Sequence, residues 1–251
     1  MAVNDEAYSR VRAAFEAHSV LLFRNQPITD ELQVAFSRRF GPLETAKAAS
    51  LGEGTPFSVL TNVDRATGAL VPPDHKEALR ARANQLWHTD SCFKAPPALA
   101  SVLSARMIPP SGGETEFASL RCAWERLSEV MRARLGNAYA WHDYAHSRGK
   151  IAPHLASERE KTALPPICWQ PGDVIMWDNR AVLHRGRPWP LDKPRHMVRT
   201  TISATDADGL AEMWPVPNTA SFLAGSTVSS FRRKPESALP LKGRDGREMD
   251  A

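Results

Sequence analysis

Hydrophobic residues near the start of the chain are spaced for two amphipathic helices with a strand between them. Asn4 or Asp5 can cap the first helix, because apolar side chains then recur every three or four residues. Residues 20–23 are an uninterrupted apolar run, the pattern of a short buried strand. Thr29 is a second capping residue, and the helix that it begins should end at Gly41-Pro42.

Most of the remaining chain consists of short strand-like runs separated by glycine- and proline-rich turns. The expected strands are residues 57–60, 99–107, 114–117, 172–177, 181–186 and 195–203. One further helix is expected from Ser119 to about Leu135. Its buried stripe would consist of Trp124, Leu127, Val130 and Met131. Residues 148–166 are polar and end in two prolines, which indicates a connector.

The order of these elements predicts the fold class. Many strands joined by turns, with helices gathered early, are typical of an α+β protein built on a β-sandwich or jelly roll. Residues 1–208 would form this single domain. Residues 209–251 are rich in Ser, Pro and Gly without periodicity, so we expect an irregular or disordered C-terminal tail.

Composition indicates an ordinary soluble globular protein. A hydrophobic content of 42% and a charged content of 24% are ordinary for a globular chain of 251 residues. No apolar run is long enough for a membrane helix, and the polar start lacks a signal peptide, so we expect a cytoplasmic protein without a membrane partner. The three cysteines are an odd, widely spaced set, typical of reduced thiols.

The net charge of +4 does not predict nucleic-acid binding. Half of the excess of Lys and Arg over Asp and Glu lies in residues 231–251, and no basic stripe with interleaved aromatic residues occurs elsewhere. An anionic small organic substrate explains the charge better. The sequence leaves the oligomeric state open, and a homo-oligomer is compatible with it.

His88 and Asp90 are the first candidates for chemistry. They are two residues apart, so in an extended segment both side chains leave from one face. An imidazole and a carboxylate on one face supply two of the three ligands of a facial triad, which suits non-heme Fe(II). The spacing alone is a weak signal. His184, in an apolar strand, could complete the triad or be an ordinary core histidine, and His142 with His146 indicates a zinc site only faintly.

Two arginines point to anionic ligands. Arg195 and Arg199 are four residues apart in an expected strand, so they share a face. Two guanidinium groups on an inner face are costly unless each meets an anion. A dicarboxylate co-substrate and an anionic primary substrate would meet that need; two surface arginines on an edge strand are the alternative.

Three motifs in order carry a resemblance to a known family. They are NQLWHTD at residues 84–90, PPSGGETEF at 109–117 and GDVIMWDNRAVLHRG at 172–186. Together they resemble the TauD/TfdA family of Fe(II)- and 2-oxoglutarate-dependent dioxygenases, and most of all its 2,4-dichlorophenoxyacetate branch. The resemblance extends over most of residues 19–203 and includes FGPLE at 40–44. It implies a double-stranded β-helix (jelly roll) core flanked by helices.

The resemblance implies a role for each matching residue. The iron ligands would be His88, Asp90 and His184. Arg195 would bind the distal carboxylate of 2-oxoglutarate, with the Thr115 hydroxyl bonded to the same group. Arg199 matches the arginine that pairs with the anionic group of the primary substrate, and Asn84 matches a pocket residue beside the metal. Trp177 matches a residue that could equally belong to the core.

The implied reaction consumes 2-oxoglutarate and O₂ and releases succinate and CO₂ as the substrate is hydroxylated. An aryloxyalkanoate similar to 2,4-dichlorophenoxyacetate would undergo ether cleavage. A dioxygenase of the taurine or alkylsulfonate type is the alternative, since a guanidinium also binds a sulfonate. A non-catalytic jelly-roll protein that binds an anion or a metal is another. A zinc hydrolase is disfavoured, because it leaves Arg195 and Thr115 unexplained.

One departure from the family affects the expected fold. Members carry a longer segment between the positions of Pro166 and Ile167, which are adjacent here. The chain is therefore either a shortened member or one from which an internal segment has been omitted. In both cases we expect an incomplete jelly roll with unpaired strand edges.

Overall fold

The computed structural model describes residues 4–46, 51–73, 75, 78, 84–92, 94, 96–136, 138–140, 163–167, 172–208 and 231–233. The chain divides into two compact units. The first comprises residues 1–121 and 144–213, and the second comprises residues 122–143 and 214–251. Every candidate site residue belongs to the first unit, so its fold decides whether those residues meet.

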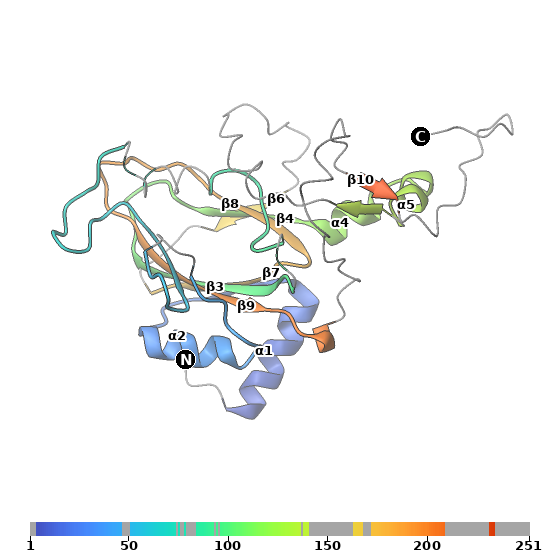
Figure 1. Ribbon diagram of the computed structural model, residues 1–251, viewed down its shortest axis with the longest axis horizontal. Helices are drawn as coiled ribbons and strands as arrows, with labels where there is room; N and C mark the ends of the chain where they lie inside the picture. The colour runs from blue at the N-terminus through green and yellow to red at the C-terminus, as the bar shows by residue number, and fades with distance from the viewer. Residues whose placement is uncertain are drawn as a thin grey trace, which may run out of the picture. The chain divides into compact units, whose positions relative to one another are not determined.

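A five-stranded antiparallel sheet forms the centre of the first unit (Figure 1). Its strands, in spatial order, are β1 (Val20–Phe23), β7 (Val174–Asp178), β3 (Ala98–Met107), β9 (His196–Ser203) and β2 (Phe57–Thr61). All five were predicted, within a few residues at their ends. Both faces of β3 and β7 are buried, which explains why apolar residues in these strands do not alternate regularly with polar ones.

Two helices cover one face of this sheet. They are α1 (Asp5–His18) and α2 (Asp30–Arg38), and both predicted caps are confirmed. The Asn4 side chain accepts from the Ala7 N–H at 2.9 Å, and the Thr29 hydroxyl accepts from the Leu32 N–H at 3.2 Å. The core between helices and sheet is built from the helical side chains Phe15 and Phe36 and the even-numbered strand residues Val102, Val174, Met176 and Ile202.

A smaller antiparallel sheet packs on the other face. Its order is β6 (Ala163–Ile167), β4 (Thr115–Ser119) and β8 (Val182–Gly186). The second core lies between the two sheets and contains Leu103, Phe117, Ile175, Trp177 and Met197. Helices and two antiparallel sheets confirm the α+β class. The arrangement of the two sheets agrees with a jelly-roll core, but the jelly-roll topology itself stays a prediction.

The expected connector at residues 148–166 was wrong for its last part. Residues 163–167 form β6, which pairs with β4 through Thr115–Ile167 and Phe117–Leu164, with a register shift between these pairs. Proline has no N–H to donate, but an edge strand does not need every donor. The position at which family members carry a longer segment, between Pro166 and Ile167, thus lies inside an edge strand.

The predicted helix from Ser119 to Leu135 was also wrong in two respects. It is two helices, α4 (Leu120–Glu125) and α5 (Glu129–Leu135), because the Ser128 hydroxyl accepts from the Met131 N–H and begins a new helix. Its expected stripe is not buried: Trp124 is 44% exposed and Val130 is 79% exposed. Helical spacing alone cannot show that a partner for the stripe is present.

Little of the predicted tail lies within the described residues. In the second unit β10 (Phe231–Arg233) pairs with β5 (Ala138–Ala140), so these three residues of the tail are a strand. A short 3₁₀ helix, η2 (Asp206–Asp208), ends the described part of the first unit. The other tail residues, His142 and His146 lie outside the described residues. Within those residues no helix has both the length and the apolar character needed to cross a membrane.

Candidate metal centre

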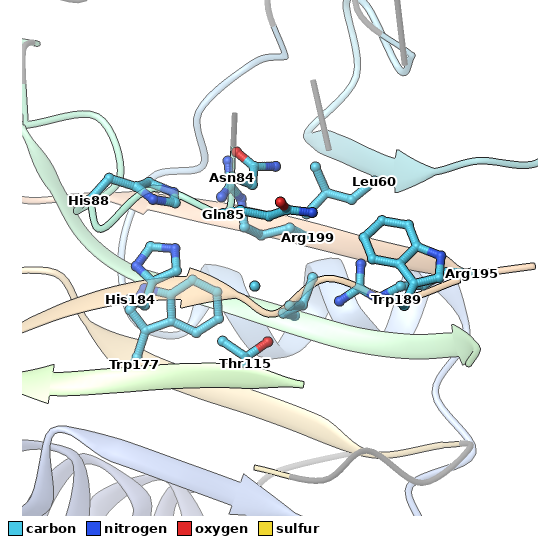
Figure 2. A pocket seen from close by; sticks show the side chains of 12 residues that line it. Leu60, Asn84, Gln85, His88, Thr115, Trp177, His184, Trp189, Arg195 and Arg199 are labelled. Atoms are coloured by element: carbon cyan, nitrogen blue, oxygen red, sulfur yellow. The ribbon is translucent and has the colours of Figure 1, made fainter. Parts of the chain in front are cut away.

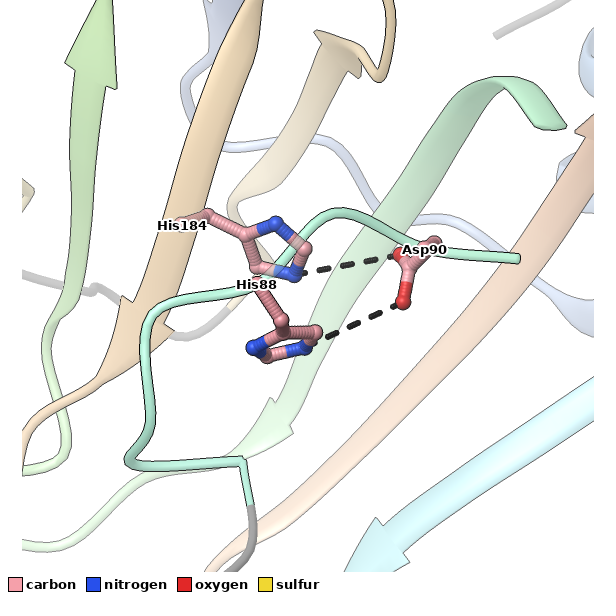
Figure 3. Close-up of side chains that lie close together, drawn as sticks. All are labelled: His88, Asp90 and His184. Carbon is pink, nitrogen blue, oxygen red and sulfur yellow. Dashed lines mark ion pairs between the residues drawn. The ribbon is translucent and has the colours of Figure 1, made fainter. Parts of the chain in front are cut away.

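His88, Asp90 and His184 lie together between the two sheets, as predicted (Figure 3). The Nε2 of His88 is 3.9 Å from the Oδ1 of Asp90, and the Nε2 of His184 is 3.8 Å from the Oδ2. The three ligand atoms all fall within 4.8 Å of one another. Two imidazole nitrogens and one carboxylate oxygen at this separation fit the donor set of a facial triad for a divalent metal such as Fe(II).

Backbone pairing brings the two distant histidines together. The His88 N–H donates to the His184 carbonyl at 3.1 Å, and the His184 N–H donates back at 2.8 Å. The Gly186 N–H donates to the Asn84 carbonyl at 3.0 Å, two residues beyond His184 on β8 and four residues before His88. The segment at residues 84–88 therefore lies along the edge of β8, joined to it by an isolated bridge between His88 and His184 and by the bond from Gly186 to Asn84. This register places the ring of His88 beside the ring of His184, with 4.2 Å between their centroids.

The hydrogen bonds of His88 select its tautomer. Its Nδ1 lies 2.7 Å from the carbonyl oxygen of Leu86, which can only accept, so Nδ1 carries the hydrogen. The lone pair of Nε2 is then directed to the side of Asp90, as a metal ligand requires.

His184 is buried and packs against Trp177, with the two rings tilted and 4.5 Å between their centroids. Burial lowers the pKa of His184 well below its usual value, and His88 acts in the same direction, whereas Asp90 opposes the shift. The neutral imidazole is thus the stable form, and only that form can bind a metal. Trp177 is 1% exposed and belongs to the core between the sheets, and its side chain also lines the pocket beside the candidate ligands.

Asp90 is held as an anion. Burial by itself would raise the pKa of this carboxyl, but Arg199, followed by His184 and His88, lowers it well below its usual range. The Arg199 Nη1 donates to Oδ1 at 2.6 Å, and the Ser101 hydroxyl donates to Oδ2 at 2.6 Å. A buried carboxylate with these partners stays ionised at neutral pH.

A pocket with about 500 Å³ of empty space, part of it open to solvent, adjoins the candidate ligands (Figure 2). Its lining includes all the residues predicted for the co-substrate and the substrate, which are Asn84, Thr115, Arg195 and Arg199. In Figure 2 the two histidines lie at one end, Arg195 with Trp189 at the other, and Arg199 between them. The expectation that both arginines share one face is confirmed.

Arg195 has the character of an anion-binding residue. It is only 6% exposed, and burial lowers its pKa to about 10, although Glu114 opposes the shift. Its Nη2 donates to the Gly113 carbonyl at 3.1 Å, whereas its Nε is buried without a hydrogen-bond partner among the described residues. A buried guanidinium with an unsatisfied donor is costly until a carboxylate reaches it.

Sequence reasoning missed several residues of this site. The pocket is also lined by Leu60, Gln85, Leu103 and Trp189, and Ser101 and Asn179 lie behind Asp90. Asn179 belonged to a motif that was singled out, but nothing in its local sequence shows what it contacts. The apolar residues carry no chemical signature, so only the packing of the strands could identify them.

Comparison with known proteins gives consistent matches. A family model described as "Taurine catabolism dioxygenase TauD, TfdA family" matches residues 1–168 and 166–201. An alpha-ketoglutarate-dependent 2,4-dichlorophenoxyacetate dioxygenase from Cupriavidus pinatubonensis is 30% identical over 76% of this chain and 86% of its own length. An alpha-ketoglutarate-dependent sulfate ester dioxygenase from Pseudomonas putida is 30% identical over 77% of this chain and 79% of its own.

A solved structure shares the fold. The crystal structure of AAD-2 in complex with Mn(II) and N-oxalylglycine superposes with a TM-score of 0.70 at 28% identity, covering 81% of this chain and 90% of that one. The family model matches in two stretches that meet at residues 166–168. The alignment with the Cupriavidus protein runs over 248 residues but takes in 76% of this 251-residue chain. Both observations agree with a segment absent near Pro166.

Proposed function

Because the chain belongs to the TauD/TfdA family and is an Fe(II)- and 2-oxoglutarate-dependent dioxygenase, we propose that it hydroxylates an aryloxyalkanoate and so cleaves the ether. The catalytic domain in this proposal is residues 1–208. His88, Asp90 and His184 hold the iron. Their donor set and separation support this assignment, as does the neutral form of His184.

The position of Arg199 is the observation that supports an anionic substrate. Its guanidinium lines the pocket and lies against Asp90, a proposed metal ligand. An anionic group bound by Arg199 is therefore held close to the proposed metal site. Leu60 and Leu103, on the pocket wall, offer apolar surface for an aromatic ring.

Residues at the other end of the pocket bind the co-substrate in this proposal. Arg195, with its unsatisfied Nε, pairs with the distal carboxylate of 2-oxoglutarate, and Thr115 lines the same space. Asn84 lines the pocket next to the metal. Trp189 lies over the Arg195 guanidinium and limits its contact with water.

The bound iron, 2-oxoglutarate and O₂ supply the oxidation, in which one oxygen atom enters succinate as CO₂ leaves and the other enters a substrate C–H bond. The contribution of the chain is to place that C–H bond. Arg199 orients the carboxylate, and the pocket wall orients the ring. When the substrate is an aryloxyacetate, hydroxylation next to the ether oxygen yields a hemiacetal, which breaks into a phenol and glyoxylate.

A sulfonate or a sulfate ester is the second candidate substrate. A guanidinium forms a two-pronged contact with either anion, and Arg199 alone does not discriminate between them. The Pseudomonas putida relative named as a sulfate ester dioxygenase supports this alternative. Because the chain belongs to a family of enzymes, a non-catalytic protein that only binds an anion or a metal is disfavoured.

Succinate release under aerobic conditions tests the proposal. The purified chain is supplied with Fe(II), 2-oxoglutarate and a panel of aryloxyacetates, aryloxypropionates, alkylsulfonates and sulfate esters. We expect the highest kcat/KM with an aryloxyalkanoate, with one phenol formed for each succinate. The aryloxyalkanoate assignment fails if only the sulfur compounds stimulate succinate release. The enzyme and its iron ligands are tested by His184→Ala, which should abolish turnover with every substrate.

A further inference from the structure

Asn179 lies directly behind the candidate metal centre and contacts several of its supports. It is buried at the turn between β7 and β8, away from the pocket. Its Oδ1 accepts from the indole N–H of Trp177 at 2.9 Å and from the Asp90 N–H at 3.3 Å. Its Nδ2 donates to the Ser101 Oγ at 3.1 Å.

These bonds have only one consistent direction. The Trp177 indole and the Asp90 backbone N–H can only donate, so the oxygen of the Asn179 amide must face them. The amide nitrogen therefore faces Ser101 and donates to its oxygen. The single hydroxyl hydrogen of Ser101 remains available for the Oδ2 of Asp90, 2.6 Å away. The chain of donors runs from Trp177 through Asn179 and Ser101 to Asp90.

Asn179 also supports the segment between the first two ligands. Its backbone carbonyl accepts from the Thr89 hydroxyl at 2.8 Å, so the residue between His88 and Asp90 is fixed from the same point. Trp177, whose N–H orients the Asn179 amide, carries the ring against which His184 packs. One buried asparagine is thus bonded to Asp90, to the residue that follows His88, and to the residue that packs against His184.

We infer that Asn179 is a positioning residue of the metal centre, which acts on Asp90 through Ser101 by a directed chain of hydrogen bonds that begins at Trp177. The inference rests on the proposed metal site. With the hydroxyl of Ser101 committed to Oδ2 and Arg199 bound to Oδ1, the carboxylate is held in one rotamer facing the two histidines. A ligand held in advance loses less freedom when the metal binds, so metal affinity rises.

Mn(II) binding to the metal-free chain, without 2-oxoglutarate or substrate, is the direct test. Free Mn(II) is followed by its electron paramagnetic resonance signal during titration of the wild type, Asn179→Ala, Ser101→Ala and the double variant. Removing a hydrogen-bond partner of a metal ligand typically costs roughly 10- to 100-fold in affinity. We expect roughly a tenfold loss for each single variant and a similar loss for the double variant, because both residues act through one chain.

Ser104→Ala is the matched control. Ser104 is as buried as Ser101 and lies on the same strand, but it faces α2, where it donates to the Gln33 side chain at 2.7 Å. We expect this variant to lose stability and to keep wild-type Mn(II) affinity. Trp177→Phe keeps an aromatic ring against His184 but removes the indole N–H together with part of the buried indole. It should weaken Mn(II) binding severalfold, and it tests the chain of hydrogen bonds if Asn179→Ala does not fold.

The outcomes distinguish a failure of the proposed metal site from a failure of the positioning role of Asn179. Absence of Mn(II) binding to the wild type would overturn the metal site itself. Wild-type affinity in Ser101→Ala and in Trp177→Phe, or in a folded Asn179→Ala, would overturn the positioning role while the metal site stands. A loss in the double variant equal to the product of the single losses would show that Asn179 does not act through Ser101.

Discussion

The Arg199 Nη1 lies 2.6 Å from the Oδ1 of Asp90, so the cation proposed to bind the substrate also touches a proposed iron ligand. The pair is nearly buried, with 16% of the Arg199 side chain and 6% of the Asp90 side chain exposed. Breaking a buried pair by removing one charge leaves the other uncompensated, which is costly. A variant that tests substrate binding must therefore keep the positive charge.

Arg199→Lys meets this condition. The lysine retains a charge near Asp90 but cannot form a two-pronged contact with a substrate carboxylate. We expect kcat/KM for the aryloxyalkanoate to fall roughly tenfold or more, because a charge-assisted hydrogen bond is lost. Steady-state succinate release measures the effect. The KM for 2-oxoglutarate should not change, and a rise in that KM without an effect on the aryloxyalkanoate would show that Arg199 belongs to another part of the site.

Trp189→Ala should weaken binding of 2-oxoglutarate. The Cζ of Arg195 lies 5.0 Å from the centroid of the Trp189 ring, and such a contact contributes about 1–2 kcal/mol when it is shielded from water. We expect the KM for 2-oxoglutarate to rise roughly tenfold, with Trp189→Phe intermediate. Trp124→Ala is the control, since Trp124 is exposed and does not line the pocket. An equal change in both variants would argue against the contact with Arg195.

Gly113→Ala should disturb Arg195 by direct contact. Gly113 has a φ of +74°, and a Cβ there would lie 3.0 Å from the Nε of Arg195 and 3.2 Å from its Cδ. Gly68→Ala is a matched control, because Gly68 has a φ of +71° with no atom within 4 Å of the new Cβ. Both variants should lose about 1–2 kcal/mol of unfolding free energy through backbone strain.

Only Gly113→Ala should raise the KM for 2-oxoglutarate, since only there does the new methyl group reach the arginine. The comparison is made by urea unfolding together with steady-state kinetics. The same KM in both variants would mean that Arg195 does not bind the co-substrate, or that its guanidinium moves aside without a loss of function.

The metal-free protein should become less stable as the pH falls below about 6.5. Because the pKa of His184 is lowered on folding, the unfolded chain binds a proton on this residue more readily than the folded chain does. The contribution of His184 is therefore present above its unfolded pKa and is lost as pH falls towards its folded pKa, by at most about 1.4 kcal/mol for each pH unit.

Urea unfolding in the presence of a chelator, at about pH 7.5 and about pH 5.5, measures this loss. In His184→Phe, which keeps a ring against Trp177 but cannot titrate, we expect the loss over this range to be smaller by about 1 kcal/mol. An unchanged pH dependence in that variant would mean that His184 accepts a proton in the folded state without penalty.

Local elements of the fold were predictable, because their causes are local. The caps at Asn4 and Thr29 depend on a side chain and a backbone N–H three residues away. The apolar run at residues 20–23 forms the predicted strand, although its four residues are partly rather than fully buried. The prediction of one buried helix at residues 119–135 was wrong because burial has a non-local cause. Whether Trp124 and Val130 are buried depends on a partner elsewhere in the chain, and spacing carries no information about that partner.

The sequence by itself determined which residue types were available and which motifs they form: an imidazole and a carboxylate two apart, a second histidine in an apolar strand, and two arginines on one strand face. Only the tertiary structure decided that these groups meet. The register between the segment at 84–88 and β8 brings His88 to His184, and the turn at Asn179 brings an amide behind Asp90. Such contacts depend on strand pairing between distant segments, which no local pattern specifies.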